Sequence, residues 1–254
     1  MKIVQSTSLL EQARSFVAEN IKPGFHDKRL ERIEALKLQD VIKRKNPYLF
    51  RAKAVASAPD MVRALLEAHL SSQEETIFGD FLEALACFVC EQVYGGIKPA
   101  THGIDLDFMR DGQRYLVSVK SGPNWANSSQ KKKMLDDFAR ARKIIGPKRS
   151  IVMVNGCCYG KDARPNKPAG NYVKLCGQDF WFLISGEADM YREIVEPLGH
   201  QAQTRNDEFA EAYGRALTRF TKDFTTAFCG SDGSINWAAI VDLNSRSKQL
   251  WSAQ

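Results

Sequence analysis

Apolar residues recur at steps of three and four from Ser8 to about Leu70, which is the spacing that places them on one face of an α-helix. Turn signals interrupt this spacing at Lys22-Pro23-Gly24, Asn46-Pro47 and Ala58-Pro59. We therefore predict that residues 1–74 form an N-terminal set of helices.

The pattern between positions 75 and 190 alternates between helical and extended segments. In chain order it predicts a helix (75–93), a hairpin of two strands (103–108 and 114–120), a helix (131–145) and a buried strand (150–156). After a loop over 156–171, the segments 172–177 and 179–186 are typical either of two further strands or of one strand and the start of a helix. This alternation predicts an α/β core over 75–190.

Aromatic residues recur at helical spacing near the C-terminus. They predict a long amphipathic helix over 207–228, and a short helix follows from near Ile235. These helices belong to a C-terminal helical region, 191–254. At this length we expect 1–254 to be a single domain with helical additions at both ends.

Composition adds an expectation about the partner. Hydrophobic residues make up 44% and charged residues 26%, as in folded proteins. The net charge of +6 favours a polyanionic partner without identifying one. The first 20 residues lack an unbroken apolar stretch, so we expect neither a signal peptide nor a membrane span, and we expect a cytoplasmic protein.

The cysteines offer a possible zinc motif, because Cys87 and Cys90 form a C-x-x-C. Both lie in an apolar helical pattern, where two thiolates cannot readily spread around a metal ion. We therefore predict buried thiols at these positions, and free thiols at all six cysteines.

Acidic and basic residues converge at the predicted hairpin. Asp105 and Asp107 project from one face of the first strand, and Ser118 and Lys120 share a face of its partner. Hydrolysis of a phosphodiester requires carboxylates that hold Mg²⁺ and an ammonium beside the attacking water. The alternative is an ordinary cross-strand salt bridge on an exposed hairpin.

A third acid, Glu83, lies within the mostly apolar helix before the hairpin, on the same helical face as Asp80 and Cys87. A buried acid needs a partner such as a metal ion. A structural glutamate at the helix surface is the other interpretation.

The segment after Lys120 combines small donors and side-chain amides with a lysine cluster. Such groups suit phosphate contacts and readout of base edges, although a capped polar loop is the alternative and the tryptophan could pack against the next helix. The candidate DNA-binding residues are Asn124, Trp125, Asn127, Ser128, Ser129, Gln130, Lys131 and Lys132.

Asp105 followed by Ser118-Val119-Lys120 resembles the motif of the PD-(D/E)xK nuclease superfamily, with Ser118 at the place of the usual second acid. The resemblance implies that Asp105 and a recruited acid hold Mg²⁺, or Mn²⁺ in its place, with the Val119 carbonyl, and that Lys120 acts on the attacking water. Ser118 would hold a water of the site. Glu83 is the first candidate for the recruited acid, and the substitutes are Asp107, Asp136 and Asp137.

Longer phrases resemble the PmeII-type family of type II restriction endonucleases. They are NPYLFRAK, EETIFGDFLE, GIDLDF, YLVSVKSGPNWANSSQ, VNGCCYG and FWFLISG. This resemblance implies a restriction-endonuclease-like αβα core, a homodimer, cleavage of a short palindromic site in double-stranded DNA, and a cognate DNA methyltransferase. Two alternatives remain: a structure-specific DNA repair nuclease of the same fold, and a DNA-binding protein without catalysis.

Overall fold

The computed structural model describes residues 8–146, 150–162 and 171–248. The predicted loop over 156–171 therefore lies partly outside the described residues. Contacts divide the chain into two units, each built from two separate stretches of sequence. Unit 1 comprises the chain up to Phe25 together with Thr76–Ala202, and unit 2 comprises His26–Glu75 together with the chain from Gln203 onward.

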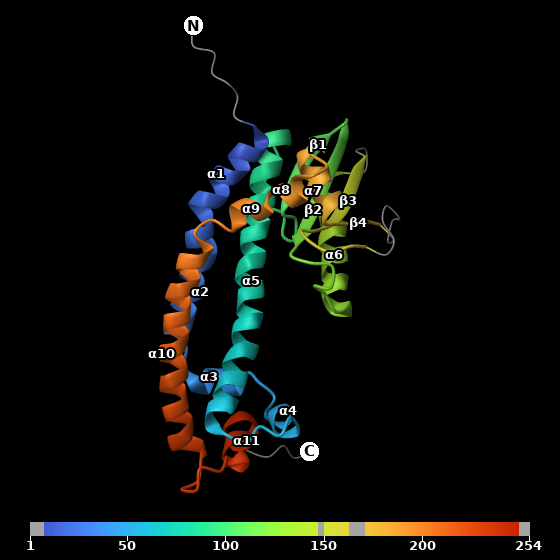
Figure 1. Cartoon of the computed structure of the whole chain (residues 1–254). Helices are drawn as coiled ribbons and strands as arrows, with labels where there is room; N and C mark the ends of the chain where they lie inside the picture. The colour runs from blue at the N-terminus through green and yellow to red at the C-terminus, as the bar shows by residue number, and fades with distance from the viewer. Residues whose placement is uncertain (1–7, 147–149, 163–170, 249–254) are drawn as a thin grey trace, which may run out of the picture. The chain divides into compact units, whose positions relative to one another are not determined.

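Unit 1 is organised around a mixed four-stranded sheet (Figure 1). Its strands are β1 (Leu106–Arg110), β2 (Gln113–Lys120), β3 (Ile151–Cys157) and β4 (Val173–Cys176), in the order β1-β2-β3-β4. β1 and β2 pair antiparallel, whereas β2–β3 and β3–β4 are parallel. Asp111 and Gly112 form the hairpin turn with φ of 51° and 74°, the left-handed conformation that a two-residue hairpin turn requires.

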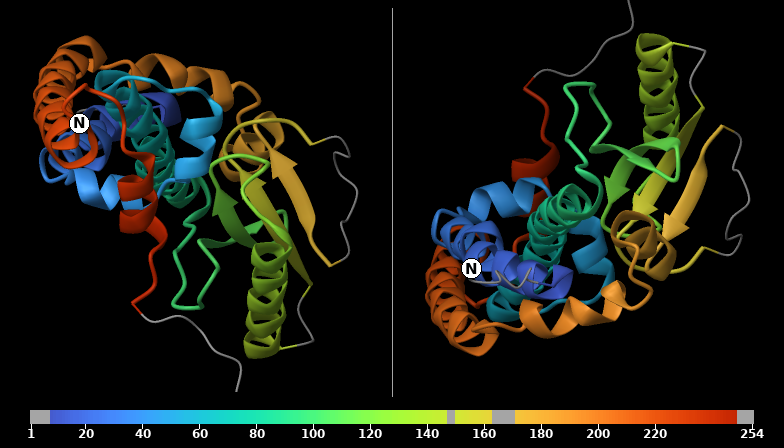
Figure 2. Two further views of the ribbon diagram at one scale, coloured as in Figure 1. Left: turned by 90° about the horizontal axis from the view of Figure 1, so that it is seen from below. Right: turned by 90° about the horizontal axis from the view of Figure 1, so that it is seen from above.

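Helices cover both faces of this sheet (Figure 2). Val117 and Val119 of β2 pack in a core with α1 (Leu9–Ile21), the second half of α5 (Ala58–Tyr94) and α7 (Gln178–Ser185). Leu116, which points to the opposite face, packs with Met134 and Phe138 of α6 (Ser128–Ile145). Period-two alternation along one strand thus separates two helical layers. The predicted αβα core is confirmed.

Short helical segments complete unit 1. They are η1 (Lys22–His26), a π-helical turn that follows α1 and ends at the boundary with unit 2, and α8 (Met190–Glu193) and α9 (Val195–Leu198), which follow α7. The sequence pattern predicted none of these three as separate elements, because they are too short to show a period.

The regular elements of unit 2 in its described residues are helices, apart from an isolated β-bridge between Cys229 and Ile235. It contains α2 (Asp27–Glu34), α3 (Leu38–Lys43), α4 (Pro47–Ala52), the first half of α5, nearly all of α10 (Ala202–Phe228) and α11 (Trp237–Ser245). Phe220, Phe224 and Phe228 of α10 are buried against Val62 and Leu65 of α5. The aromatic spacing that predicted the long C-terminal helix therefore marks its buried face.

Two of the predicted boundaries differ from the structure in ways that have a clear cause in the sequence. The turn signal at Ala58-Pro59 begins a helix, but that helix continues unbroken to Tyr94, so the predicted interruption near residue 74 is wrong. The polar run from Ser71 to Glu75 resembles a linker in composition, yet it contains no glycine or proline that would end a helix. The helix after the polar loop begins at Ser128 instead of residue 131. For the segments 172–177 and 179–186, the predicted alternative of one strand followed by a helix is confirmed, since they form β4 and α7.

No helix in the described part of the chain combines the length and apolar character needed to cross a lipid bilayer.

Candidate active site

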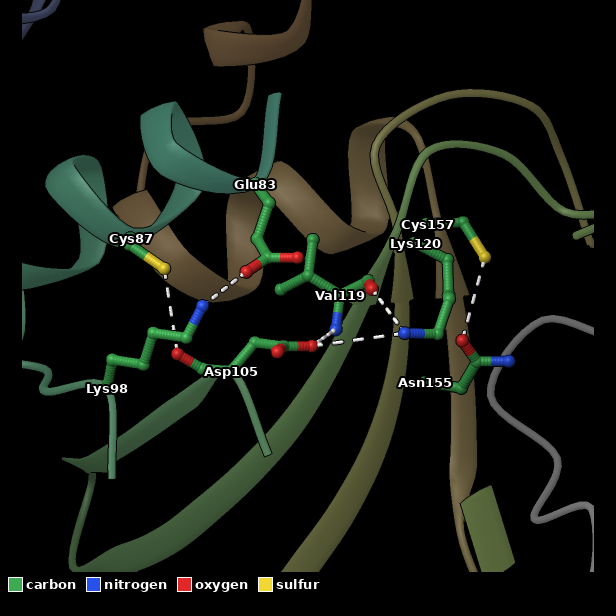
Figure 3. Close-up of polar contacts among 8 residues, drawn as sticks. All are labelled: Glu83, Cys87, Lys98, Asp105, Val119, Lys120, Asn155 and Cys157. Carbon is green, nitrogen blue, oxygen red and sulfur yellow. Dashed lines mark hydrogen bonds and ion pairs between the residues drawn. The ribbon is translucent and has the colours of Figure 1, made fainter. Parts of the chain in front are cut away.

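Asp105 and Lys120 lie close together at the C-terminal end of β2 (Figure 3). Asp105 directly precedes β1, and its backbone N–H donates to the Val117 carbonyl at 2.8 Å, which extends the β1–β2 pairing by one residue. Its Oδ2 accepts a hydrogen bond from the Val119 backbone N–H at 2.7 Å. The same oxygen lies 3.9 Å from Lys120 Nζ. The structure therefore brings together the two residues that the sequence places in adjacent strands.

The Lys120 ammonium is positioned by two groups besides Asp105. Its Nζ donates to the Val119 carbonyl at 2.7 Å and lies 5.2 Å from the centre of the Trp125 ring, within cation–π range. The side chain of Lys120 is 27% exposed and that of Asp105 is 15% exposed. At 3.9 Å this pair is at the outer limit of an ion pair, so it leaves the ammonium accessible to a phosphate.

Glu83 lies on α5 beside Asp105, and its carboxylate is paired with Lys98 (Figure 3). Lys98 Nζ donates to Glu83 Oε1 at 2.7 Å. Glu83 is half-buried on α5, whereas the mostly apolar pattern of this helix suggested a more buried position. Burial, followed by the neighbouring Glu83 carboxylate, raises the pKa of Asp105 above its usual value, against the lowering effects of Lys120, the Val119 N–H and Lys98.

The substitutes for Glu83 are held in other contacts. Asp107 forms a two-pronged ion pair with Arg114, at 2.6 and 2.8 Å. Asp136 is exposed on α6. Asp137 is buried and contacts His102 at 3.3 Å and Arg140 at 3.0 Å. Glu83 is therefore the candidate whose carboxylate acts directly on the charge of Asp105.

A buried polar row on the sheet includes residues that sequence reasoning missed. Ser118, which is 2% exposed, pairs in register with Asn155 of β3, and Lys120 pairs with Cys157. Asn155 is 3% exposed, and its Oδ1 accepts from Cys157 Sγ at 3.9 Å. Asn155 is the one amide side chain in the otherwise mostly apolar segment 150–156, and this contrast could have marked it as a candidate site residue. No periodicity marks Lys98, because it lies in the loop between α5 and β1.

The predicted DNA-binding segment divides into a loop and a helix start. Asn127 is the N-cap of α6: its Oδ1 accepts from the Gln130 N–H at 3.0 Å, while Gln130 Oε1 accepts from the Asn127 N–H at 2.9 Å. Asn124 is exposed, whereas Trp125 is partly buried against Met134 and Phe138 of α6. The exposed residues in the helical part are Ser128, Ser129, Gln130, Lys131 and Lys132.

Contacts from β3 and β4 hold the start of this loop. The Lys174 ammonium donates to the Pro123 carbonyl at 3.1 Å, and the Tyr159 N–H donates to the Ser121 carbonyl at 3.1 Å. Gly122 is buried against the Tyr159 ring, where any side chain would collide with it. The backbone that follows Lys120 is thus tied to the sheet.

All six cysteines are free thiols. Cys87 donates to the Asp105 carbonyl oxygen at 3.6 Å. Burial, reinforced by Glu83, raises the pKa of Cys87 to about 11, and burial raises that of Cys90 to about 12. Both thiols lie on the continuous helix α5, as their apolar pattern predicts.

The oxygen atoms at this site fit a magnesium ion. The Glu83 carboxylate raises the pKa of Asp105, and the Val119 carbonyl accepts from Lys120, the lysine that lies 3.9 Å from Asp105. Mg²⁺ is usually bound by one or two carboxylates together with waters and substrate phosphates. No cluster of three or more His, Cys, Asp or Glu side chains suited to a metal ion occurs among the described residues. The Lys98 ammonium is the positive group that is paired with Glu83.

Replacing Asp105 by Asn is expected to raise the free energy of unfolding at neutral pH when divalent ions are absent. The raised pKa means that the folded state holds the proton more tightly than the unfolded chain does. The stability that the native chain gains from this bound proton is fully present at pH values below the pKa of Asp105 in the unfolded chain. It is lost as the pH rises through the pKa of Asp105 in the folded protein. Urea denaturation in EDTA at several pH values should show a higher free energy of unfolding for Asp105→Asn than for the native chain at neutral pH, and this difference should disappear in acid.

The matched control is Asp107→Asn, which leaves Arg114 without its carboxylate and should lower the free energy of unfolding by about 1–3 kcal/mol. A variant Asp105→Asn that is less stable than the native chain at neutral pH would contradict the electrostatic interpretation.

Comparison with known families assigns the chain. The family model described as type II restriction endonuclease EcoO109I matches residues 11–206, which is more than half of the chain. Comparison with curated proteins gave no match. The PmeII-type resemblance stays a prediction at this finer level. The chain belongs to the type II restriction endonuclease EcoO109I family and is therefore a site-specific deoxyribonuclease.

Proposed function

We propose that this endonuclease hydrolyses duplex DNA at a short palindromic site with Mg²⁺ held by Asp105 and Glu83. The observation that supports the proposal is the convergence of the Asp105 carboxylate with the Lys120 ammonium, 3.9 Å apart, beside Glu83. In this proposal the site is a PD-(D/E)xK site of the PmeII type, whose second acid comes from helix α5 in place of Ser118.

Each residue of the site has a distinct role. Asp105, Glu83 and the Val119 carbonyl oxygen hold the metal ion, for which type II restriction endonucleases have a general need. When bound, Mg²⁺ supplies Lewis-acid polarisation of the phosphoryl group, and Mn²⁺ substitutes for it. Ser118, on the same strand face as Lys120, supplies a hydroxyl that holds a water of the site.

Lys120 acts on the attacking water and the phosphate. Its ammonium is fixed by the Val119 carbonyl and the Trp125 ring, so it is oriented before the substrate arrives. The water oxygen bonds to phosphorus as the bond to the leaving oxygen breaks; the attacking water gives up a proton to solvent, the leaving oxygen takes one from solvent, and negative charge accumulates on the phosphoryl oxygens. A nearby ammonium stabilises this charge.

The segment Asn124 to Lys132 supplies the DNA contacts. Asn124 and the first turn of α6 are exposed, directly after the strand that carries Lys120. Lys131 and Lys132 contact phosphates, and the exposed amide of Asn124 reads base edges beside Ser128, Ser129 and Trp125. The oxygens of Asn127 and Gln130 cap α6, so these two residues contact DNA through their side-chain NH₂ groups. A two-fold homodimer would place two such sites on a palindrome, one for each strand. A cognate methyltransferase would protect the host DNA at the same sequence.

We expect the native protein and Mg²⁺ to cut a long DNA of known sequence into discrete fragments. The variants Asp105→Asn and Lys120→Met should lose about 10³-fold or more of the cleavage rate, since each removes charge from the reacting centre. Binding of duplex DNA in Ca²⁺ should persist in both. Sequencing of the fragment ends then identifies the cut site and shows whether it is palindromic.

The matched controls are Asp111→Asn, at the exposed hairpin turn, and Lys143→Met, on the exposed part of α6. Both should cut at the native rate. Native cleavage by Asp105→Asn or Lys120→Met would refute the assignment of the site. Nicking that follows DNA structure instead of sequence would favour a repair nuclease.

The identity of the second acid is tested by comparing Glu83→Gln with Asp107→Asn. Glu83→Gln should abolish cleavage, because it removes a metal ligand. Asp107→Asn should retain most of the activity, because Arg114 already holds that carboxylate. If Asp107→Asn is inactive and Glu83→Gln is active, the recruited acid is Asp107.

The roles of Lys131 and Lys132 are tested by the salt dependence of DNA binding. Replacing either by Ala should reduce the slope of log K against log[salt] by about one and weaken binding to all sequences alike. Asn124→Ala should instead relax discrimination among sites. An unchanged salt slope in both lysine variants would place the phosphate contacts elsewhere.

A further inference from the structure

Lys98 occupies the side of Glu83 that faces the Asp105 segment (Figure 3). Its Nζ lies 2.7 Å from Glu83 Oε1, and its charge opposes in part the rise in the pKa of Asp105 that burial and Glu83 cause. Lys98 is thus a second ammonium at the site, supplied by the loop that joins α5 to β1. The catalytic role assigned to Lys120 does not account for it.

The charges at the site balance while no divalent ion is bound. Two carboxylates, Asp105 and Glu83, face two ammonium groups, Lys98 and Lys120. A divalent ion that bonds to Glu83 meets a carboxylate whose Oε1 already accepts a hydrogen bond from Lys98, and it would be repelled by that ammonium at short range. Lys120 is held by the Val119 carbonyl and the Trp125 ring. Lys98 is the ammonium free to withdraw, since its side chain is 61% exposed.

We propose that Lys98 is an internal counter-cation of the metal site, whose ammonium neutralises Glu83 until a divalent ion displaces it. The inference rests on the proposed metal site of Asp105 and Glu83. Lys98 therefore offsets the repulsion between the two acids in the metal-free protein and weakens metal binding through its ion pair with Glu83 and its repulsion of the metal ion. An isolated surface ion pair, the simpler interpretation, would leave metal affinity unchanged.

The test measures Mn²⁺ affinity in the absence of DNA, by titration calorimetry or by the loss of the free-ion resonance signal. Lys98→Met should lower the dissociation constant for Mn²⁺ by about two- to tenfold, because the ion pair with Glu83 and the repulsion between the ammonium and the metal ion are both lost. Lys98→Arg, which keeps the ion pair, should bind Mn²⁺ as the native protein does. Lys143→Met removes the same charge from an exposed part of α6 and should leave the affinity unchanged.

A double-mutant comparison separates the ion pair from the general loss of positive charge. In a Glu83→Gln background, where Asp105 remains to bind Mn²⁺ more weakly, Lys98→Met should tighten Mn²⁺ binding by less than it does in the native background, because the ion pair of Lys98 is already gone and only its repulsion of the metal ion is lost. Thermal melting checks that each variant is folded, and Lys98→Gln provides the same comparison if Lys98→Met aggregates.

The outcomes distinguish this inference from the proposed function. If Asp105→Asn abolishes Mn²⁺ binding while Lys98→Met leaves the native affinity or weakens it, the counter-cation role is overturned and the metal site stands. If neither Asp105→Asn nor Glu83→Gln changes Mn²⁺ affinity, the metal is not bound by these acids, and both proposals fail.

Discussion

The hydrogen bond from the Val119 backbone N–H to Asp105 Oδ2 is the contact on which the geometry of the site depends. It ties a carboxylate that precedes β1 to the backbone of β2, so the acid cannot turn away from Lys120. The Val119 carbonyl, on the other side of the same residue, accepts from the Lys120 ammonium. One residue of the central strand thus holds both charged groups, and the sheet that forms around β2 supplies the rigidity. A site supported in this way is positioned before substrate binds.

That arrangement carries an electrostatic cost. Asp105 is largely buried next to a second carboxylate, which is why its pKa is raised. The two ammonium groups offset this cost in different ways. Lys120 is fixed by the strand and by Trp125, whereas Lys98 reaches Glu83 from an exposed loop. Mutual repulsion between acids is expected where a protein must bind a divalent ion, and it makes the site less stable than its surroundings.

Continuity of the chain links catalysis to the proposed DNA contacts. Lys120 ends β2, the next residues are tied to β3 and β4, and Asn127 then begins α6 through its reciprocal hydrogen bonds with Gln130. Within this segment, Trp125 belongs to the core beneath α6 as well as to the surroundings of Lys120. Displacement of the α6 start by bound DNA would therefore be transmitted to Lys120 over a short stretch of chain.

The sequence by itself determined the αβα class, the hairpin and the proximity of Asp105 to Lys120. Those features follow from local periodicity and from the alternation of side chains on adjacent strands, which a linear pattern records directly. It could not decide that α5 is a single helix, that Asp107 pairs with Arg114, or that Asn127 and Gln130 cap α6. Nor did it indicate Lys98 or Asn155 at the site. The partner of a charged or amide side chain depends on which segments fold against it, and that information exists only once the chain has packed.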